Sequence, residues 1–281
     1  MNTSTLPSGT RLAFIGGGNM ASAIIGGLIR QGLPATQIDV VEPFAAQRDK
    51  LRAEFGVQTF EQAGPALGTA HAMVWAVKPQ TFKDAALACA AHTHNALHLS
   101  VAAGIRSDSM VAWLGTERIV RAMPNTPALV GLGMTGLYAR PAASPEDRKL
   151  VDAVVGTTGR FVWLNAESDL DAVTALSGSG PAYVFYFLEA MRRAGTEMGL
   201  SAQTATELAI GTFVGAATLA QSSDEPPEVL RERVTSKGGT TYAALTSCSR
   251  AGLAEGRPQW VDSVPRTWCK TRPCAPDSRR I

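Results

Sequence analysis

Short apolar runs alternate along the first half of the chain with stretches whose apolar residues recur three and four positions apart. The runs predict buried strands, and the longer spacing predicts helices. The expected strands are 11–16, 38–41, a short third strand, 71–77, 96–101 and 118–123. The expected helices are one that follows the first strand and runs to residue 30, and those over 44–55, 79–91 and 106–113. Residues 131–139 and 159–163 are further expected strands around a helix over 145–155. This alternation predicts an α/β fold with a doubly wound parallel sheet.

Only helical periodicity follows after about residue 165. The expected helices there are 181–199, 201–221 and 228–234. We therefore expect an N-terminal domain over 1–165, an all-α domain over 166–247 and an atypical tail over 248–281. Helix 201–221 is apolar or small on nearly every side, and Gly211, Gly215 and Ala216 would allow close approach. A small domain has too few helices to cover it, which predicts a subunit interface, most simply a two-fold dimer.

A glycine-rich segment lies directly between the first expected strand, which ends at Ile15, and the first expected helix. It reads Gly16-Gly17-Gly18-Asn19-Met20-Ala21, the G-x-G-x-x-A spacing of a Rossmann-like dinucleotide-binding turn. The first glycine would make the turn, the next would let the backbone approach a pyrophosphate, and the small last residue would let the helix pack on the strand. A tight turn without a ligand is the alternative.

The carboxyl ends of parallel strands are where such sheets bind ligands. Glu42 follows the second strand, at a position where an acid commonly accepts a hydrogen bond from the ribose 2′-hydroxyl of NADH. Arg48 could offset its charge, and Glu42 could also be an acid at a strand end with no role in binding. The cofactor is therefore expected to be NADPH or NADH. Lys78 and Asn125 are candidates for the cofactor's ribose and amide, or turn residues only. The other expected cofactor residues at these ends are Ala76, Val77, Pro79, Ala102 and Ala103.

Two turns of hydroxyls and glycines precede helices in the second half. Ser177-Gly178-Ser179-Gly180 comes before Pro181, a residue favoured at the first position of a helix. Ser236-Lys237-Gly238-Gly239-Thr240-Thr241 is the second turn. Bare N–H groups at a helix start attract carboxylates, although helix capping alone would explain either turn.

The composition excludes several classes of protein. The net charge is +2, but residues 248–281 alone carry +4, so the body is slightly acidic and gives no sign of nucleic-acid binding. No apolar run is long enough for a membrane span, and the first residues do not read as a signal peptide. Four cysteines in 281 residues favour a reducing cytoplasm over a disulfide framework. His92, His94 and His98 cluster, but Cys89 is the only further ligand whose spacing could fit a metal site. We therefore interpret the histidines as surface residues and expect no metal.

The chain resembles the pyrroline-5-carboxylate reductases, which catalyse the last step of proline synthesis. The resemblance rests on I-G-G-G-N-M at 15–20, A-V-K-P at 76–79, R-A-M-P-N-T-P-A at 121–128, S-G-S-G-P-A-Y at 177–183 and V-T-S-K-G-G-T-T at 234–241. It implies a Rossmann domain followed by a helical dimerisation domain, with hydride passing from NADPH or NADH to C5 of the cyclic imine.

The resemblance also implies residue roles on the substrate side. Thr241 is implied as the catalytic hydroxyl facing the ring nitrogen, and Asp224 or Glu225 as an acid near that nitrogen. The loop of Ser236, Gly239, Thr240 and Thr241 is implied to bind the substrate carboxylate. From the residues alone, the turn with Ser177 and Ser179 could hold the same carboxylate. Pocket loops rich in Ser, Thr, Gly and Asn suit this reaction, because a protonated imine accepts hydride directly and needs placement more than a strong acid.

Two features depart from the family. Lys237 stands where most members have proline. The family continues after residue 247 with helices, whereas residues 248–281 hold three of the four cysteines and four prolines, which a long helix does not tolerate. We interpret this tail as a shifted reading frame near codon 247; a zinc site at Cys248, Cys269 and Cys274 lacks a fourth ligand. Reduction of another imino or keto acid, and a catalytically silent dinucleotide-binding dimer, stay open as alternatives.

Overall fold

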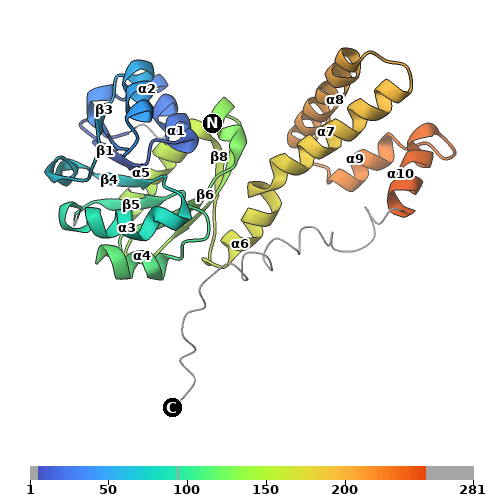
Figure 1. Cartoon of the computed structure of the whole chain (residues 1–281). Coiled ribbons are helices and arrows are strands. Elements are labelled where there is room, and N and C mark those ends of the chain that lie inside the picture. The colour runs from blue at the N-terminus through green and yellow to red at the C-terminus, as the bar shows by residue number, and fades with distance from the viewer. Residues whose placement is uncertain (1–5, 94, 251–281) are drawn as a thin grey trace. The chain divides into compact units, whose positions relative to one another are not determined.

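The structure is a computed structural model and describes residues 6–93 and 95–250. The chain divides into two compact units, Met1–Ser179 and Gly180–Ile281. The first unit contains the sheet and the second is helical (Figure 1). The predicted α/β class with a following helical region is confirmed.

Eight strands of the described residues form one sheet in the order β3-β2-β1-β4-β5-β6-β7-β8. The strands are β1 (Leu12–Ile15), β2 (Ile38–Val41), β3 (Gln58–Phe60), β4 (Ala72–Trp75), β5 (Leu97–Ser100), β6 (Ile119–Met123), β7 (Gly133–Ala139) and β8 (Gly159–Trp163). The pairs among β1 to β6 are parallel, as predicted. β7 is antiparallel to β6, which the sequence did not predict. The connection over 124–132 is shorter than the dozen or more residues that a parallel crossover needs.

Helices cover both faces of the sheet. They are α1 (Asn19–Arg30), α2 (Ala45–Phe55), α3 (Pro79–Cys89), α4 (Ser107–Leu114) and α5 (Pro145–Val155). Shorter 3-10 turns are η1 (Ala35–Gln37), η2 (Pro65–Thr69), η3 (Ala90–His92), η4 (Thr126–Val130) and η5 (Gly156–Thr158). α6 (Asp169–Val173) and the π-helical segment η6 (Thr174–Gly178) end the unit.

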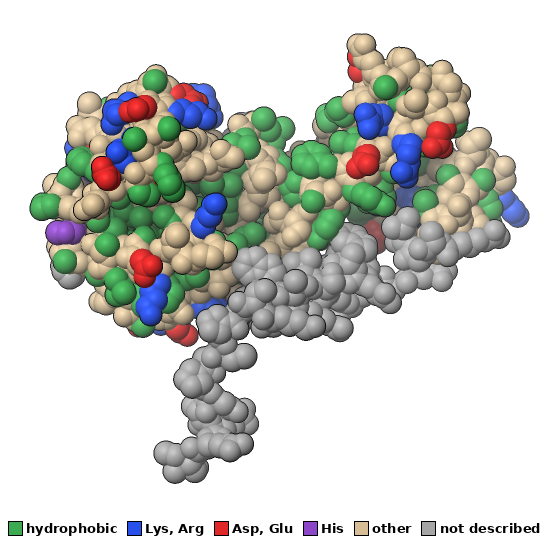
Figure 2. Space-filling view, viewed as in Figure 1, with side chains coloured by type: hydrophobic (Ala, Val, Ile, Leu, Met, Phe, Trp, Pro, Cys, Tyr) green, Lys and Arg blue, Asp and Glu red, His purple; other side chains and the backbone are tan. Residues whose placement is uncertain are grey.

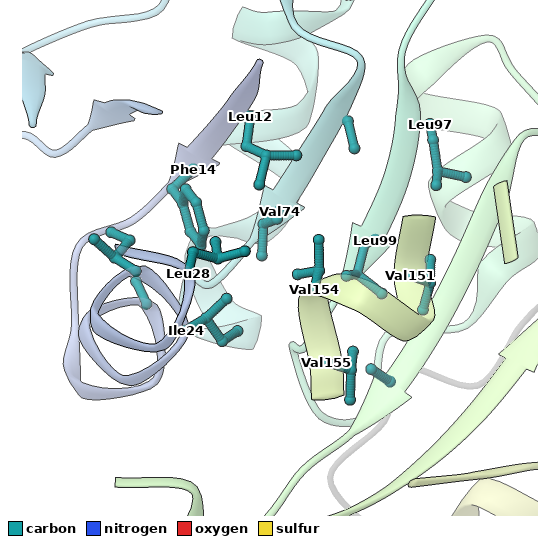
Figure 3. Close-up of a cluster of buried hydrophobic side chains, with 14 of the residues drawn as sticks. Leu12, Phe14, Ile24, Leu28, Val74, Leu97, Leu99, Val151, Val154 and Val155 are labelled. Atoms are coloured by element: carbon teal, nitrogen blue, oxygen red, sulfur yellow. The ribbon is translucent and has the colours of Figure 1, made fainter. Parts of the chain in front are cut away.

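Alternate residues of the central strands pack into different cores, as a pleated strand requires. Leu12 and Phe14 of β1 lie in a cluster with Ile24 and Leu28 of α1 and with Val154 of α5 (Figure 3). Ala13 and Ile15 of the same strand lie in the second cluster, with residues of α3 and α4. The strands β1, β2, β4 and β5 are therefore fully buried between two helical layers, which fixes the position of their carboxyl ends, whereas the edge strands β3 and β8 are partly exposed.

One predicted surface residue is buried. His98 on β5 has no exposed surface, and its Nδ1 accepts a hydrogen bond from Nε1 of Trp75 at 3.0 Å. Interpreting it as a surface histidine was wrong, because the strand turns this position into the core, where the imidazole stacks on Trp75 with ring centroids 5.8 Å apart. His94 lies outside the described residues, which contain no cluster of His, Cys, Asp and Glu able to hold a metal ion.

The second unit is built from α7 (Gly180–Glu197), α8 (Ala202–Ser222), α9 (Pro227–Arg233) and α10 (Thr240–Arg250). α7 and α8 pack against each other through Phe187 and Phe213, whose ring centroids are 6.4 Å apart. A Cβ on Gly195 would lie 2.9 Å from Cβ of Ala205, so this glycine lets the two helices meet closely. No helix in the described ranges is long and apolar enough to cross a membrane.

Candidate cofactor and substrate sites

The carboxyl ends of β1 and β4 meet at the point where the strand order changes direction. Gly16 has φ of +93°, and a Cβ there would lie 2.7 Å from the carbonyl oxygen of Ala76. The N–H of Ala76 donates to the carbonyl of Ile15 at 2.8 Å. The glycine turn and the turn over 76–79 are thereby held side by side, where doubly wound sheets bind dinucleotides.

The first turn of α1 is open to a ligand. Gly18 is the N-cap residue, no side chain caps the helix, and its first turn contains no acid. Gly18 and Asn19 lie at this helix start; Asn19 is exposed, and a Cβ added to Gly18 would meet nothing within 4 Å. Free N–H groups at the positive end of a helix dipole suit a diphosphate. This part of the predicted turn fits a dinucleotide.

Glu42 is turned toward the glycine segment. It is buried, Oε2 accepts from the N–H of Gly17 at 2.9 Å, and Oε1 accepts from the N–H of Phe44 at 3.0 Å. Gln47 donates to the carbonyl of Gly17 from the other side. Both carboxylate oxygens thus accept backbone N–H groups. Glu42 therefore stabilises the glycine turn, whether or not it also binds a ribose.

Arg48 is tied to the same strand end. Its Nη1 donates to the carbonyls of Glu42 at 2.8 Å and Pro43 at 2.7 Å, and its Nη2 lies 3.3 Å from Glu61. The guanidinium of Arg48 thus lies at the carboxyl end of β2, where Glu42 also lies.

The turn that follows β5 is anchored by a residue that the sequence analysis missed. Glu167 accepts from the N–H of Ser107 at 2.7 Å and from its hydroxyl at 2.8 Å, at the start of α4. It also pairs with the buried Arg121 of β6 at 2.7 Å. Burial raises the pKa of Glu167, but these three donors outweigh it and hold the pKa below its usual value. Glu167 lies far from Ser107 in the chain and in no motif, so no sequence signal indicated it.

Ala102 and Ala103 lie in the turn just before that anchored helix start. The N–H of Val101 donates to the carbonyl of Trp75 at 3.0 Å, which keeps the end of β5 beside the end of β4. Lys78 is the exposed N-cap residue of α3 and makes no capping bond through its side chain. The predicted residues of β1, β2, β4 and β5 therefore share one edge of the sheet.

Asn125 follows β6, and both ends of its side-chain amide are engaged. Nδ2 donates to the carbonyl of Ser177 at 3.1 Å, and Oδ1 accepts from the N–H of Met134 at 2.9 Å. These partners fix the orientation of the amide, because a carbonyl requires a donor and an N–H requires an acceptor.

The segment around Ser177 is not the predicted tight turn. α6, η6 and α7 follow one another from Asp169 to Glu197, with only Ser179 between the last two, and η6 is a π-helix. The N–H of Ser179 already donates to the carbonyl of Thr174 at 2.9 Å. The prediction of a helix start with bare N–H groups was wrong here, because the helical run through η6 occupies that donor. π-Helical bulges are frequent at functional sites.

The predicted turn at 236–241 is confirmed as a helix start. Gly238 has φ of +75°, the N–H of Gly239 donates to the carbonyl of Ser236 at 3.0 Å, and α10 begins at Thr240. A Cβ on Gly239 would lie 2.6 Å from Oγ of Ser236, so the glycine keeps this hydroxyl at the helix start. Thr241 is half-buried in the first turn.

The two predicted acids of the second unit differ in their surroundings. Glu225 pairs with Arg233 of α9, and its N–H donates to Oγ of Ser223 at 3.1 Å. Asp224 is exposed. The turn at 236–241 and these acids belong to the helical unit, whereas the cofactor-side residues belong to the first.

Comparisons with known proteins agree with both halves of this description. Residues 167–264 match the family "Pyrroline-5-carboxylate reductase dimerisation", and residues 11–104 match the family "NADP oxidoreductase coenzyme F420-dependent". The pyrroline-5-carboxylate reductase of Pseudomonas aeruginosa is 46% identical over 245 residues, which are 86% of this chain and 90% of that protein. The Haemophilus influenzae enzyme of the same name is 45% identical over 240 residues, 83% of this chain and 87% of that protein.

Solved structures with the same names share the fold. The Coxiella burnetii pyrroline-5-carboxylate reductase has a TM-score of 0.86 and 33% identity, covering 93% of this chain and 98% of that one. The Plasmodium falciparum pyrroline carboxylate reductase, solved with NADP bound, has a TM-score of 0.81 and 26% identity, covering 93% and 96%. The chain belongs to the pyrroline-5-carboxylate reductase family.

Proposed function

We propose that this protein reduces 1-pyrroline-5-carboxylate to L-proline, with NADPH or NADH as the reductant. The family supports the reaction, and the open, uncapped start of α1 at Gly18 is the structural observation that carries the cofactor part. The domains are proposed as 1–165 for the dinucleotide and 166–247 for substrate and assembly.

On the cofactor side, the proposed contacts lie along the carboxyl edge of the sheet. Gly18 and Asn19 bind the diphosphate through the start of α1, and Glu42 keeps Gly17 in place. Lys78 and the turns after β4 and β5 line the nicotinamide half. Bound there, the nicotinamide supplies a hydride to C5 of the protonated imine. The proposed set is Ile15, Gly16, Gly17, Gly18, Asn19, Met20, Glu42, Ala76, Val77, Lys78, Pro79, Ala102 and Ala103. Asn125, whose amide bonds Ser177 and Met134, supports this edge of the sheet without a direct contact to the cofactor.

On the substrate side, the start of α10 binds the carboxylate of the ring. Ser236 supplies a hydroxyl, and Thr240 opens the helix, where N–H groups lack partners within the helix. Gly239, whose N–H donates to the Ser236 carbonyl, gives this helix start its shape. Thr241 places its hydroxyl at the ring nitrogen. Asp224, with Glu225 partly neutralised by Arg233, contributes negative charge for the iminium. Ser177 and Ser179 complete the proposed set.

We also propose that the chain works as a homodimer. Large apolar side chains of α7 and α8 are exposed in the single chain, among them Phe185, Leu208 and Val214, and Figure 2 shows apolar side chains gathered on the helical unit. A Cβ on Gly211 or Gly215 would meet nothing, so this side of α8 has room for another chain. An exposed apolar surface of this kind marks an association site. The cytoplasmic location expected from composition stays part of the proposal.

The deciding experiment measures oxidation of NADH and NADPH, side by side, on addition of 1-pyrroline-5-carboxylate. Proline formation with either cofactor supports the proposal. Binding of cofactor without its oxidation would instead show a silent dinucleotide-binding protein, and turnover only with another imino or keto acid would show a different substrate.

A further inference from the structure

Two motifs that the sequence presents as separate sites are joined through one amide. Asn125 follows β6, whereas Ser177 lies in η6, and the amide Nδ2 donates to the Ser177 carbonyl at 3.1 Å. Its Oδ1 accepts from the N–H of Met134 at the start of β7. Asn125 thus joins the end of the sheet to the π-helical segment within the first unit.

The Ser177 carbonyl accepts a side-chain donor because of the residue four positions later. In an α-helix the carbonyl of residue 177 would accept from the N–H of residue 181, and residue 181 is proline, which has none. A carbonyl that is withdrawn from water without a donor costs roughly the desolvation of that group. Asn125 supplies a donor where the α-helical pattern cannot.

Gly178, the residue after Ser177, also packs closely against the end of the sheet. A Cβ on Gly178 would lie 2.6 Å from Cε of Met123, the last residue of β6. η6 therefore lies against the side chain at the end of β6, close to where Asn125 reaches it.

We propose that Asn125 is a positioning residue that supplies the donor that Pro181 lacks and so holds the carbonyl of Ser177, and with it the segment carrying Ser177 and Ser179, against the end of the sheet. It acts on the reaction through that segment, not by binding the cofactor amide directly. Its kinetic test rests on the proposed function, whereas its coupling to position 181 is independent of it.

The test is a double-mutant cycle of Asn125→Asp and Pro181→Ala. Asn125→Asp keeps an oxygen for Met134 but places a carboxylate oxygen at the Ser177 carbonyl. We expect kcat/KM to fall about tenfold or more at neutral pH, and the denaturation midpoint to fall with it. In the Pro181→Ala background, where an N–H is restored, the loss caused by Asn125→Asp should shrink to about threefold or less.

A pH profile gives a second, separate readout. Once protonated, the carboxyl group introduced by Asn125→Asp regains an O–H donor, so the single variant should recover part of its midpoint and activity relative to the parent as the pH falls. The matched control is Asn165→Asp, at an exposed loop position, which should show neither effect.

Three results would overturn the inference. One is a loss for Asn125→Asp that is equal in both backgrounds, which would show no coupling to position 181. If NADPH binding without substrate is then also weakened more than about tenfold, the loss comes from direct cofactor contact. Another is the absence of any loss. The third is a loss of activity and stability in Asn125→Asp that is not partly recovered at low pH. This result decides the question if Pro181→Ala does not fold.

Discussion

The carboxylate of Glu42 accepts the backbone N–H of Gly17 at 2.9 Å, across 25 positions of sequence. The acid at the end of β2 is therefore part of the glycine turn itself. An acid here is commonly interpreted only as a partner of the ribose. In this chain it has a prior structural task, which leads to a first prediction.

Glu42→Gln should destabilise the protein and weaken cofactor binding together. Glutamine has one acceptor oxygen, so either the Gly17 or the Phe44 N–H would face an NH₂ group. We expect about 1–3 kcal/mol lower unfolding free energy in a denaturant titration. Glu61→Gln, at an exposed ion pair, should change it by less than about 0.5 kcal/mol. A shift of NADH-to-NADPH preference with unchanged stability would mean that Glu42 serves the ribose alone.

Gly18→Ala should separate cofactor binding from folding. The φ of Gly18 is −72° and an added Cβ has free space, so the fold should be retained with a melting temperature within a few degrees of the parent. The methyl group would nevertheless block close approach of a diphosphate, and we expect the NADPH Kd to rise at least about tenfold. Calorimetric titration measures it.

Gly16→Ala is the matched contrast for that experiment. With φ of +93° and the Ala76 carbonyl 2.7 Å from the new Cβ, this variant should lose stability before any ligand is added. Unchanged NADPH affinity in Gly18→Ala would remove α1 as the diphosphate site.

His98 should make stability fall as the pH drops below neutrality. Burial lowers the pKa of His98 to about 4, whereas the unfolded value is near 6.5. Between these two pKa values the unfolded chain binds a proton at His98 and the folded chain does not. The contribution of neutral His98 to the unfolding free energy is therefore complete above about pH 6.5 and is lost progressively toward pH 4. The total loss is about 3 kcal/mol.

His98→Asn is the matched variant for this pH effect. It keeps an acceptor for Trp75 but does not titrate, so the slope of unfolding free energy against pH should be smaller than in the parent over that window. Urea titrations at about pH 4.5, 5.5 and 7 give the slopes. Equal slopes in both proteins would show that His98 is protonated in the folded state.

Glu167→Ala should lower the unfolding free energy more than the removal of any surface acid. It would leave Arg121, whose side chain is 7% exposed, without its partner, and we expect a loss of about 3–5 kcal/mol in unfolding free energy. The exposed pair of Asp49 and Arg52 is the control, since Asp49→Asn should cost less than about 1 kcal/mol. Comparable losses for both variants would mean that Glu167 does not compensate a buried charge.

Val214→Asp should prevent assembly through α8. The Val214 side chain is 61% exposed in the single chain, so the fold of one chain should tolerate the change, whereas a charge inside an apolar interface should not be tolerated. Light scattering after gel filtration should show the parent as a dimer or larger and the variant as a monomer. Gln221→Asp, exposed at the end of the same helix, should assemble like the parent. A variant that assembles normally would place the interface elsewhere.

The strands and helices of the first unit followed from local pattern. β2, β8 and α5 were predicted at their exact bounds, and the other strands and helices that were given bounds lie within a few residues, because each buried strand is a short apolar run and each helix a periodic one. The glycine turn was also predictable, since Gly16 requires a positive φ that its residue type permits. The start of α10 was predictable from Gly238 for the same reason.

The contacts that join distant segments were not predictable. Glu167 and Ser107 lie 60 positions apart, and Asn125 and Ser177 lie 52 apart, so no local spacing links them. The antiparallel β7 and the π-helical form of η6 likewise depend on which neighbour each segment meets.

By itself, the sequence determined the order of elements, the Rossmann-like class, the family and the residue types at each strand end, because these depend on side-chain chemistry and short-range periodicity. Only the tertiary structure decided that His98 is buried, that Glu42 holds Gly17 and that the Asn125 amide reaches the Ser177 carbonyl. Such partners are selected by how the elements pack, and a buried polar group must bond whichever donor or acceptor that packing brings to it.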